Sequence, residues 1–445
     1  MKAVIVAGGK GTRIRCVSGE SIPKALLPVA GQPIIYRQIE LLKRYGIKEI
    51  IFLLGYLGDL LENAIASASI LEGIEATFYI EKEPLGTAGG LLAARERLSK
   101  EDFLVLYGDI AIEVDLHRLS QFHKQNQSVF TLTAHPNDHP HSSDLLVVDG
   151  NARLLNLLPK NGRAPGNYRN LVPAALYCLS PDIFKFIQPS TKQDFILDVI
   201  PRLLHAGQSV SVYNTPEYLR DMGTPERFQT VEEHIRTGFM SRMNFSFKRP
   251  TIFLDRDGVI NQDLPDKGIN QPSELNLFPS ATKAIQTINR AGWLAVVVTN
   301  QPQLAKGYLT SEGLDRIHAK LETALGRGHA WLDRIYFCPH HPEQGHIGEI
   351  KALKISCECR KPKTGMFLQA IQDLPIDTEN AYVIGDTWRD FQAAKILGFN
   401  AYGVDAALQK RVEKNVVQPD LWFSNVLETV QFILQNAPKR LQSPT

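Results

Sequence analysis

Short runs of apolar and β-branched residues alternate along this chain with longer stretches in which apolar residues recur every three or four positions. The short runs predict buried strands, and the longer stretches predict amphipathic helices. Regular alternation of the two is typical of parallel sheets that are covered by helices. We therefore expect an α/β protein built from doubly wound, mainly parallel sheets.

The first series of elements opens with a strand at Ala3–Ala7. After it we expect strands at 49–54, 77–81, 103–107 and 210–213, and helices at 34–45, 59–66, 86–98 and 224–237. The segment Leu145–Leu158 predicts a hairpin around Asp149-Gly150-Asn151, because Asp-Gly suits a primed turn.

A polar, irregular stretch at Gly238–Arg249 interrupts this series, and the pattern restarts with a strand at Thr251–Leu254. We then expect strands at 294–298 and 381–384, and helices at 280–290, 311–325, 365–374 and 391–397. The pattern therefore predicts four parts, which are domains at 1–237 and 250–437, a linker at 238–249 and a tail at 438–445.

Composition narrows the classes of function. The 445 residues include 49 basic and 47 acidic ones, and a net charge of +2 favours neither nucleic acid nor a membrane as a partner. The chain has no apolar run of about 18 residues and no signal-peptide core, so we expect a cytoplasmic protein. Five cysteines do not make a disulfide framework, and we expect Cys16 and Cys178 to be ordinary thiols.

A glycine-rich loop, Gly8-Gly9-Lys10-Gly11-Thr12-Arg13, follows the first strand directly. Glycines let the backbone approach a ligand, and successive N–H groups can bind an anion. Arg13 and Lys24 add cations that suit phosphate. On the loop alone, a plain glycine turn is as well supported as a phosphate site, and the Walker pattern of P-loop NTPases is absent.

Further polar residues follow other strands of the first series. Asp109 ends the strand at 103–107, and Asp221 precedes Gly223-Thr224-Pro225. Ligands of a parallel sheet collect at the carboxyl ends of its strands, where two carboxylates can hold Mg²⁺. Either aspartate alone suits a cap or a turn, but beside the glycine loop the metal site is favoured.

As an ordered set, these motifs resemble those of the sugar-1-phosphate nucleotidylyltransferases over residues 1–237. The resemblance implies a Rossmann-like fold and transfer of a nucleotidyl group from a nucleoside triphosphate to a sugar 1-phosphate, with release of pyrophosphate. The implied nucleotide site consists of Gly8, Gly9, Gly11, Thr12, Arg13, Leu85, Gly86, Thr87 and Asp109. Arg13 and Lys24 are its implied catalytic cations, and Asp109 and Asp221 are the implied Mg²⁺ ligands.

The chain departs from this family at its sugar motifs. Leu158-Pro159-Lys160-Asn161 stands where relatives often carry Glu-Lys-Pro, and Val172-Pro173-Ala174-Ala175 stands where they often carry Asn-Ala-Gly. Asp198 does match a family position, and the resemblance implies that it binds substrate.

In the second series, Asp255 and Asp257 follow the strand at 251–254. Of two such carboxylates, one can attack phosphorus and the other can protonate the leaving oxygen. Asp386 and Thr299 follow two further strands, and Lys361 can offset the repulsion between the acids and a phosphate. A helix cap is the alternative for any single aspartate.

This constellation resembles the haloacid-dehalogenase phosphatases over residues 250–437. The resemblance implies that Asp255 forms an aspartyl-phosphate and that Asp257 is the general acid and base. It implies that Thr299 and Lys361 hold the phosphoryl group. Asp386 would complete a Mg²⁺ site with Asp255 and the backbone carbonyl of Asp257.

A cluster of cysteines precedes Lys361. Cys338, His340, Cys357 and Cys359 offer three sulfurs and one imidazole, which suit a closed tetrahedral zinc site. His341 is a competing imidazole, and isolated buried thiols are the alternative to a metal site. The intervening segment 342–356 predicts a long loop whose base the metal would fix.

Cys-Pro-His-His-Pro followed by Cys-x-Cys-Arg-Lys-Pro resembles a narrower group, the zinc-containing D-glycero-D-manno-heptose 1,7-bisphosphate 7-phosphatases. That resemblance implies that Asn300, Gln301, Lys306 and Arg360 contact the substrate. The pair Pro302-Gln303 stands where relatives commonly have Ser-Gly.

Together the resemblances imply one bifunctional enzyme of GDP-heptose biosynthesis, and so of lipopolysaccharide, with sugar phosphates and a nucleoside triphosphate as its partners. The sequence leaves open whether the chain forms a homo-oligomer. One alternative is a mannose-1-phosphate guanylyltransferase fused to a histidinol-phosphatase-like domain. A second is an active phosphatase with a degenerate, regulatory sugar-nucleotide domain.

Overall fold

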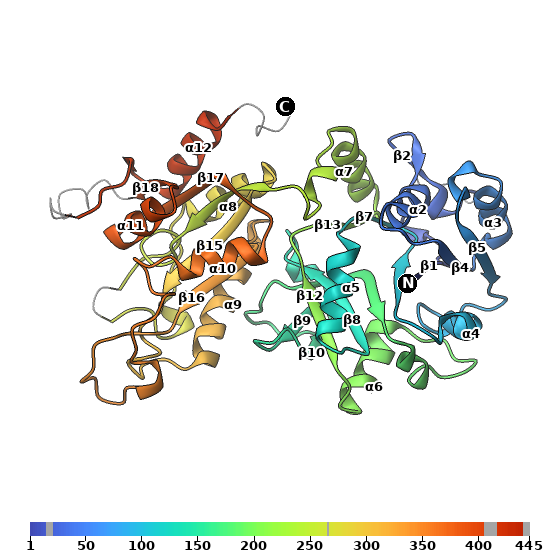
Figure 1. Ribbon diagram of the computed structural model, residues 1–445, viewed down its shortest axis with the longest axis horizontal. Coiled ribbons are helices and arrows are strands. Elements are labelled where there is room, and N and C mark those ends of the chain that lie inside the picture. Colours follow the sequence, from blue (N-terminus) through green and yellow to red (C-terminus); the bar gives the residue numbers. More distant parts are fainter. Residues whose placement is uncertain (15–20, 265–266, 405–415, 439–445) are drawn as a thin grey trace. The chain divides into compact units, whose positions relative to one another are not determined.

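The computed structural model describes residues 1–14, 21–264, 267–404 and 416–438, so Cys16 and residues 439–445 of the expected tail lie outside it. The chain divides into two compact units, each with one large sheet (Figure 1). Unit 1 comprises Met1–His135, Leu146–Leu157 and Pro173–Asn244, and unit 2 comprises Pro136–Leu145, Leu158–Val172 and Phe245–Thr445. Within the described residues, no helix is long and apolar enough to cross a membrane.

Unit 1 is built on a seven-stranded sheet in the order β12-β8-β11-β6-β1-β4-β5. Its strands are β1 (Lys2–Ala7), β4 (Glu49–Leu54), β5 (Glu75–Ile80), β6 (Phe103–Tyr107), β8 (Phe130–His135), β11 (Val172–Leu179) and β12 (Val210–Asn214). The pairs around β1 and β4 are parallel, whereas β11 runs antiparallel to β6. Three two-stranded ladders join β2 (Pro28–Val29) to β3 (Gln32–Pro33), β7 (Ile110–Glu113) to β13 (Tyr218–Asp221), and β9 (Leu145–Val148) to β10 (Leu154–Leu158).

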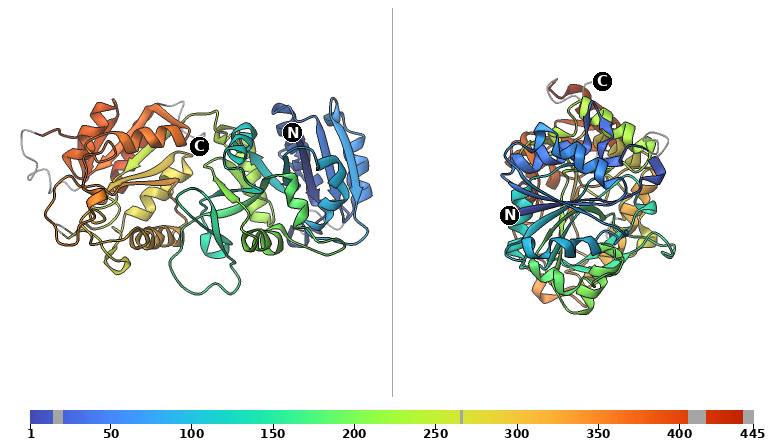
Figure 2. Two further views of the ribbon diagram at one scale, coloured as in Figure 1. Left: turned by 60° about the horizontal axis from the view of Figure 1, so that its bottom comes forward. Right: turned by 90° about the vertical axis from the view of Figure 1, so that its right-hand side faces the viewer.

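Helices cover both faces of this sheet, as the right-hand view of Figure 2 shows. The helices are α2 (Ile34–Arg44), α3 (Gly58–Ala66), α4 (Arg95–Leu98), α5 (Leu116–Gln125), α6 (Ile200–His205) and α7 (Pro225–Arg236). Apolar side chains of α2, α3 and α5 pack on one face, against residues such as Ile5 and Phe52. On the other face, the rings of Phe130, Tyr177 and Phe195 pack against one another in tilted and edge-to-face arrangements.

Unit 2 has a six-stranded sheet in the order β16-β15-β14-β17-β18-β19, and all of its pairs are parallel. Its strands are β14 (Arg249–Leu254), β15 (Leu294–Asn300), β16 (Arg334–Cys338), β17 (Ile376–Gly385), β18 (Asn400–Val404) and β19 (Leu421–Phe423). Its helices are α8 (Ala281–Arg290), α9 (Ser311–Arg327), α10 (Gly365–Asp373), α11 (Trp388–Ile396) and α12 (Val426–Asn436). The core packs α8, α9 and α12 on one face and α10 and α11 on the other. The doubly wound, mainly parallel α/β fold is thereby confirmed.

Two stretches from the first half of the chain belong to unit 2, and the stretch Leu158–Val172 packs against α9. Arg169 donates through Nε to Oε2 of Glu322 at 2.9 Å and through Nη1 to Asp315 at 2.6 Å. The Asn170 N–H donates to the same Glu322 oxygen at 2.7 Å. The altered motif at 158–161 therefore begins a segment that is anchored in unit 2.

Two local predictions were wrong. The helix expected at 86–98 does not begin at Gly86, whose φ of +79° lies outside the right-handed helical region. That stretch instead forms a 3₁₀ helix (Gly89–Ala94) followed by α4. The hairpin is present, but its turn is closed by the Asp149 carboxylate, which accepts from the N–H groups of Asn151 and Arg153. The left-handed residue is Ala152 and not Gly150, so the turn is not the primed two-residue type.

Candidate functional site

A cavity of about 830 Å³ lies in unit 1 where β1, β4 and β6 end. Ligands of parallel sheets gather at this edge because the strand ends expose backbone groups and turn residues there. The predicted residues that line the cavity are Gly8, Gly9, Gly11, Lys24, Gly86, Thr87 and Asp109. The structure therefore brings the glycine loop, one predicted cation and one predicted carboxylate to a single cavity.

Asp109 and Asp221 come close through the ladder of β7 and β13. Asp221 pairs in register with Ile110, and the Met222 N–H donates to the Asp109 carbonyl at 3.3 Å. Lys24 Nζ lies 2.6 Å from Oδ2 of Asp109. Burial alone would raise the pKa of Asp221, but hydrogen bonds from Arg227 and the Gly223 N–H, with the charge of Lys24, lower it. Asp221 is thus held as a carboxylate, and the oxygens of Asp109 and Asp221 are ligands of the kind that Mg²⁺ prefers.

Other predicted residues of unit 1 lie outside the lining of this cavity, namely Thr12, Arg13, Leu85, Asp198 and Asp221. Arg13 is exposed and lies against Gly223, where an added Cβ would be 3.2 Å from its Nη2. Asp198 accepts from the Asp194 N–H at 2.7 Å. It is Asp194 that contacts the 85–87 motif, by accepting from the Thr87 hydroxyl at 2.8 Å.

Four charged residues of this cavity were not singled out from the sequence, namely Lys10, Glu81, Lys82 and Lys192. Glu81 follows β5, and its Oε2 accepts from the Leu85 N–H at 3.3 Å. Burial raises the pKa of the Glu81 carboxyl. Its position at the end of an expected strand, three residues before Pro84, was the signal that could have identified it.

A smaller cavity of about 290 Å³ lies in unit 2, and it is lined by Asp255, Asp257, Thr299, Asn300, Lys306, Arg360, Lys361 and Asp386. Every predicted phosphatase residue except Gln301 therefore faces one space. Lys361 is buried, and its Nζ lies 3.0 Å from Oδ2 of Asp255, 2.5 Å from Oδ1 of Asp390 and 2.7 Å from the Val298 carbonyl. Thr299 is also buried at the end of β15. The ammonium group is thus aimed at the predicted nucleophile.

Carboxylates crowd around Asp255. Asp255, Asp386 and Asp390 place oxygens within 4.8 Å of one another, a group that can hold a metal ion. Burial raises the pKa of Asp255, as do the charges of Asp390 and Asp257, although Lys361 opposes them. Burial and the charges of Asp255 and Asp390 raise the pKa of Asp386 as well. Such crowding of oxygen ligands fits a divalent cation, which would relieve the repulsion.

Gly258 permits this close approach. Its φ is +83°, and a Cβ at this position would lie 2.0 Å from Oδ2 of Asp386. Any larger residue after Asp257 would therefore displace the Asp386 carboxylate.

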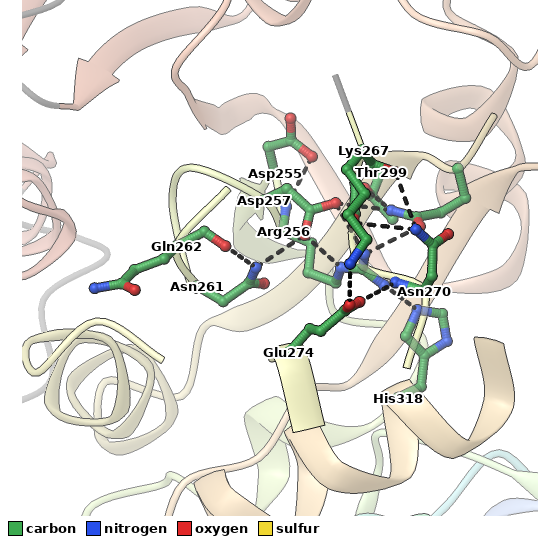
Figure 3. A network of polar contacts seen from close by, with 12 residues as sticks. Asp255, Arg256, Asp257, Asn261, Gln262, Lys267, Asn270, Glu274, Thr299 and His318 are labelled. Carbon is green, nitrogen blue, oxygen red and sulfur yellow. Dashed lines mark hydrogen bonds and ion pairs between the residues drawn. The ribbon is translucent and has the colours of Figure 1, made fainter. Parts of the chain in front are cut away.

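Asp257 is held by a buried polar network (Figure 3). Arg256 donates to it twice, from Nε at 3.0 Å and from Nη2 at 2.8 Å. Asn261 and Gln301 donate to it at 2.9 and 3.0 Å. Burial would raise the pKa of Asp257, but the charge of Arg256 and these hydrogen bonds lower it. In this arrangement Asp257 is a carboxylate with both oxygens hydrogen-bonded.

Gln301 and Asn300 have different surroundings although they are adjacent. Gln301 is fully buried behind Asp257, and its amide nitrogen also donates to the Thr299 hydroxyl at 3.0 Å. Asn300 exchanges two hydrogen bonds with the backbone of Lys361, at 3.0 and 3.1 Å. Asn300 therefore fixes the segment that carries the lysine, while Gln301 contacts the cavity only through Asp257 and Thr299.

A second group that can hold a metal ion consists of Cys338, His340, Cys357 and Cys359, with their ligand atoms within 4.8 Å of one another. His340 Nδ1 lies 3.2 Å from Sγ of Cys359, and the closest sulfur pair, Cys338 and Cys359, is 3.1 Å apart. The neighbouring His341 lies outside this group and contacts the Glu343 carbonyl at 3.4 Å. Arg360 and Lys361 follow Cys359 directly, so the group anchors the segment that enters the cavity.

Comparison with known proteins identifies both units. Residues 2–238 match the Nucleotidyl transferase family model, and residues 358–429 match the HAD-hydrolase-like model. D-glycero-beta-D-manno-heptose-1,7-bisphosphate 7-phosphatase of Haemophilus ducreyi is 32% identical over 187 residues, which are 42% of this chain and 98% of that protein. Mannose-1-phosphate guanyltransferase of Yarrowia lipolytica is 30% identical over 233 residues, which are 51% of this chain and 62% of that protein.

Among solved structures, HddC from Yersinia pseudotuberculosis is 27% identical, with a TM-score of 0.46 over 53% of this chain and 99% of that one. The family matches confirm the two enzyme classes predicted from the motifs, a nucleotidyltransferase and a phosphatase. The chain therefore belongs to the nucleotidyl transferase family through residues 2–238, and it also belongs to the D-glycero-beta-D-manno-heptose-1,7-bisphosphate 7-phosphatase family.

Proposed function

We propose that this chain carries out two consecutive steps toward a nucleotide-activated heptose. Unit 2 removes the 7-phosphate of D-glycero-D-manno-heptose 1,7-bisphosphate. Unit 1 then transfers a nucleotidyl group, GMP from GTP, to the resulting heptose 1-phosphate. The observation that carries the proposal is that each unit has its own cavity with the charged groups that its reaction needs.

In the phosphatase step, a carboxylate oxygen of Asp255 attacks the phosphorus, and the bond between phosphorus and the sugar oxygen breaks. Asp257 gives a proton to that oxygen, because an alkoxide is a poor leaving group. Water then attacks the aspartyl-phosphate and loses its proton to Asp257, which releases inorganic phosphate and restores Asp255. Lys361, 3.0 Å from Asp255, opposes the repulsion between this carboxylate and the phosphate.

The lowered pKa of Asp257 suits the second half of this cycle, in which the carboxylate accepts a proton. In the first half, an approaching phosphate dianion raises the proton affinity of the same carboxylate by like-charge repulsion. Asp257 can therefore alternate between donor and acceptor without a second titrating residue.

In the transferase step, an oxygen of the sugar 1-phosphate attacks the α-phosphorus of GTP, and pyrophosphate leaves. The glycine loop, Lys24 and Arg13 bind the phosphates and stabilise the charge that develops there. Guanine is favoured because the half-buried Glu81 carboxylate lines the cavity. The edge of guanine offers two adjacent N–H donors, N1–H and the N2 amine, and both oxygens of one carboxylate can accept from them.

Two kinds of metal ion fit the donor sets. Asp255 and Asp386 in unit 2, with the Asp257 carbonyl, and Asp109 and Asp221 in unit 1 are oxygen ligands for Mg²⁺, which supplies charge stabilisation to phosphates. The cysteine and histidine group suits Zn²⁺, because tetrahedral Zn–S bonds of about 2.3 Å place sulfurs about 3.8 Å apart. The three sulfur pairs lie 3.1, 3.3 and 3.6 Å apart, each shorter than that spacing, so the sulfurs would move slightly apart around a bound ion. Free thiols at these positions also suit a reducing, cytoplasmic location.

The test is a substrate panel in which phosphate and pyrophosphate release are measured separately. Among the phosphate esters of the panel, we expect only the heptose bisphosphate to release phosphate. We expect pyrophosphate only when heptose 1-phosphate and GTP are both present. Release of phosphate from histidinol phosphate with pyrophosphate from mannose 1-phosphate would favour the alternative fusion. GTP binding without pyrophosphate from any sugar 1-phosphate would favour a regulatory unit 1.

A further inference from the structure

The guanidinium group of Arg256 occupies a position that the proposed mechanism does not use. Arg256 stands between the two aspartates in sequence, yet its side chain is fully buried and does not line the cavity. We propose that Arg256, itself oriented by His318 of α9, is the positioning residue that aims the Asp257 carboxylate at the leaving oxygen. The inference rests on the phosphatase step proposed above and adds to it how the proton donor is held.

The contact between Arg256 and Asp257 is a fork. Nε and Nη2 each meet one oxygen of the same carboxylate, at 3.0 and 2.8 Å. Two parallel hydrogen bonds fix the plane of a carboxylate as well as its distance, which a single ammonium group cannot do. The fork therefore defines one orientation of Asp257.

Arg256 is in turn held on its far side. His318 Nε2 lies 3.3 Å from Nη1, and the Gln301 amide oxygen accepts from Nη2 at 3.0 Å. A guanidinium group only donates, so His318 Nε2 is the acceptor in this contact. His318 is buried and extends from α9 toward Arg256 in Figure 3. Nε, Nη1 and Nη2 of Arg256 thus all have partners, and together these contacts fix the orientation of the side chain.

A role in bulk stability alone does not explain this arrangement. A buried cation costs free energy unless it is paired, and a hydrophobic residue of similar size is often as stable. The network also places the Gln301 amide nitrogen on both Asp257 and Thr299, at 3.0 Å each. The same hydrogen-bond network therefore fixes the positions of Asp257, the proposed proton donor, and of Thr299, whose hydroxyl would face the phosphate.

The test compares substrates whose leaving groups differ in their need for a proton. The 4-nitrophenolate ion leaves without protonation, whereas the sugar alkoxide does not. The comparison uses kcat/KM, which reports the formation of the aspartyl-phosphate and not its later hydrolysis, in which Asp257 serves both substrates alike. Asp257→Asn sets the reference, and it should lower kcat/KM for the heptose bisphosphate at least about 100-fold more than kcat/KM for 4-nitrophenyl phosphate. Arg256→Lys keeps the charge and loses the fork. It should lower kcat/KM for the heptose bisphosphate about 10-fold to 100-fold while changing kcat/KM for 4-nitrophenyl phosphate less than about threefold.

His318 supplies a second, independent variant pair. His318→Leu removes the acceptor and should show the same split with a loss of about 3-fold to 10-fold, while His318→Gln restores an acceptor and should recover most of the rate. Equal losses on both substrates in Arg256→Lys, or no loss in either Arg256→Lys or His318→Leu, would overturn the positioning role. If Asp257→Asn shows no split, the assigned proton donor is wrong and the inference fails with it.

Discussion

The contact between Arg169 and Glu322 leads to a quantitative prediction about stability. Glu322 is nearly buried, and its side chain accepts from Nε and Nη2 of Arg169 and from the Asn170 N–H. Arg169→Ala removes three charge-assisted hydrogen bonds, two to Glu322 and one to Asp315, and leaves the Glu322 carboxylate with one donor. Loss of such a partner from a fully buried pair costs about 3–5 kcal/mol. Arg169 is 38% exposed, so water compensates for part of this loss and we expect about 2 kcal/mol.

Thermal unfolding followed by calorimetry measures this cost. For a unit of this size, about 2 kcal/mol corresponds to a fall in Tm of roughly 4–8 °C in the transition of unit 2. Arg316→Ala is the matched control, because Arg316 is an exposed arginine on the same helix, α9, and it should shift Tm by less than about 1 °C. A shift in Arg169→Ala no larger than that of the control would refute the reasoning. It would mean that the segment 158–172 does not depend on α9 for its place.

Three further outcomes follow from the sites. Asp255→Asn should abolish phosphate release, because an amide is a very poor nucleophile, and it should leave pyrophosphate release from supplied heptose 1-phosphate and GTP unchanged; a folded variant that loses both activities would contradict independent sites. A Cys357→Ser, Cys359→Ser double variant should bind less than a tenth of the zinc that elemental analysis finds per wild-type chain, and full occupancy would exclude these ligands. Glu81→Gln should lower kcat/KM for GTP about 10-fold or more and reduce the preference over UTP, and an unchanged ratio would remove Glu81 from base recognition.

The sequence predicted the parts of the fold that depend on local pattern. The strand before Asp255 is a continuous apolar run, and the helix that begins at Pro225 is capped by the Thr224 side chain; both are present as expected. The prediction of a helix from Gly86 was wrong. Gly86 adopts a positive φ, which ends any helical conformation at that residue. The backbone of this motif hydrogen-bonds instead to Gln193, more than a hundred residues away, and no local pattern records such a contact.

The same limit applies to the sites. Residues in recognisable motifs, such as Asp255 and Lys361, were predicted, and the structure brings them within 3.0 Å. His318 was not predicted, because it lies within an amphipathic helix whose charged residues favour a solvated surface. The role proposed for His318 depends on Arg256, and the packing of α9 on the sheet brings the two side chains together. Reasoning from sequence identifies residues whose type and motif indicate a catalytic role. It misses residues whose role depends only on where the fold places them.

The two cavities share their position at the ends of parallel strands, and they differ in volume as their substrates do. Both lie where parallel strands end, and both place a lysine on an aspartate, Lys24 on Asp109 and Lys361 on Asp255. The cavity of about 290 Å³ in unit 2 has room for one sugar phosphate beside a buried lysine. The cavity of about 830 Å³ in unit 1 must admit a nucleotide and a sugar together, and its lining carries the additional lysines Lys10, Lys82 and Lys192. A reaction between two bound substrates needs this larger site, whereas a covalent intermediate on Asp255 lets the phosphatase use its sugar phosphate and then water in turn at a smaller site.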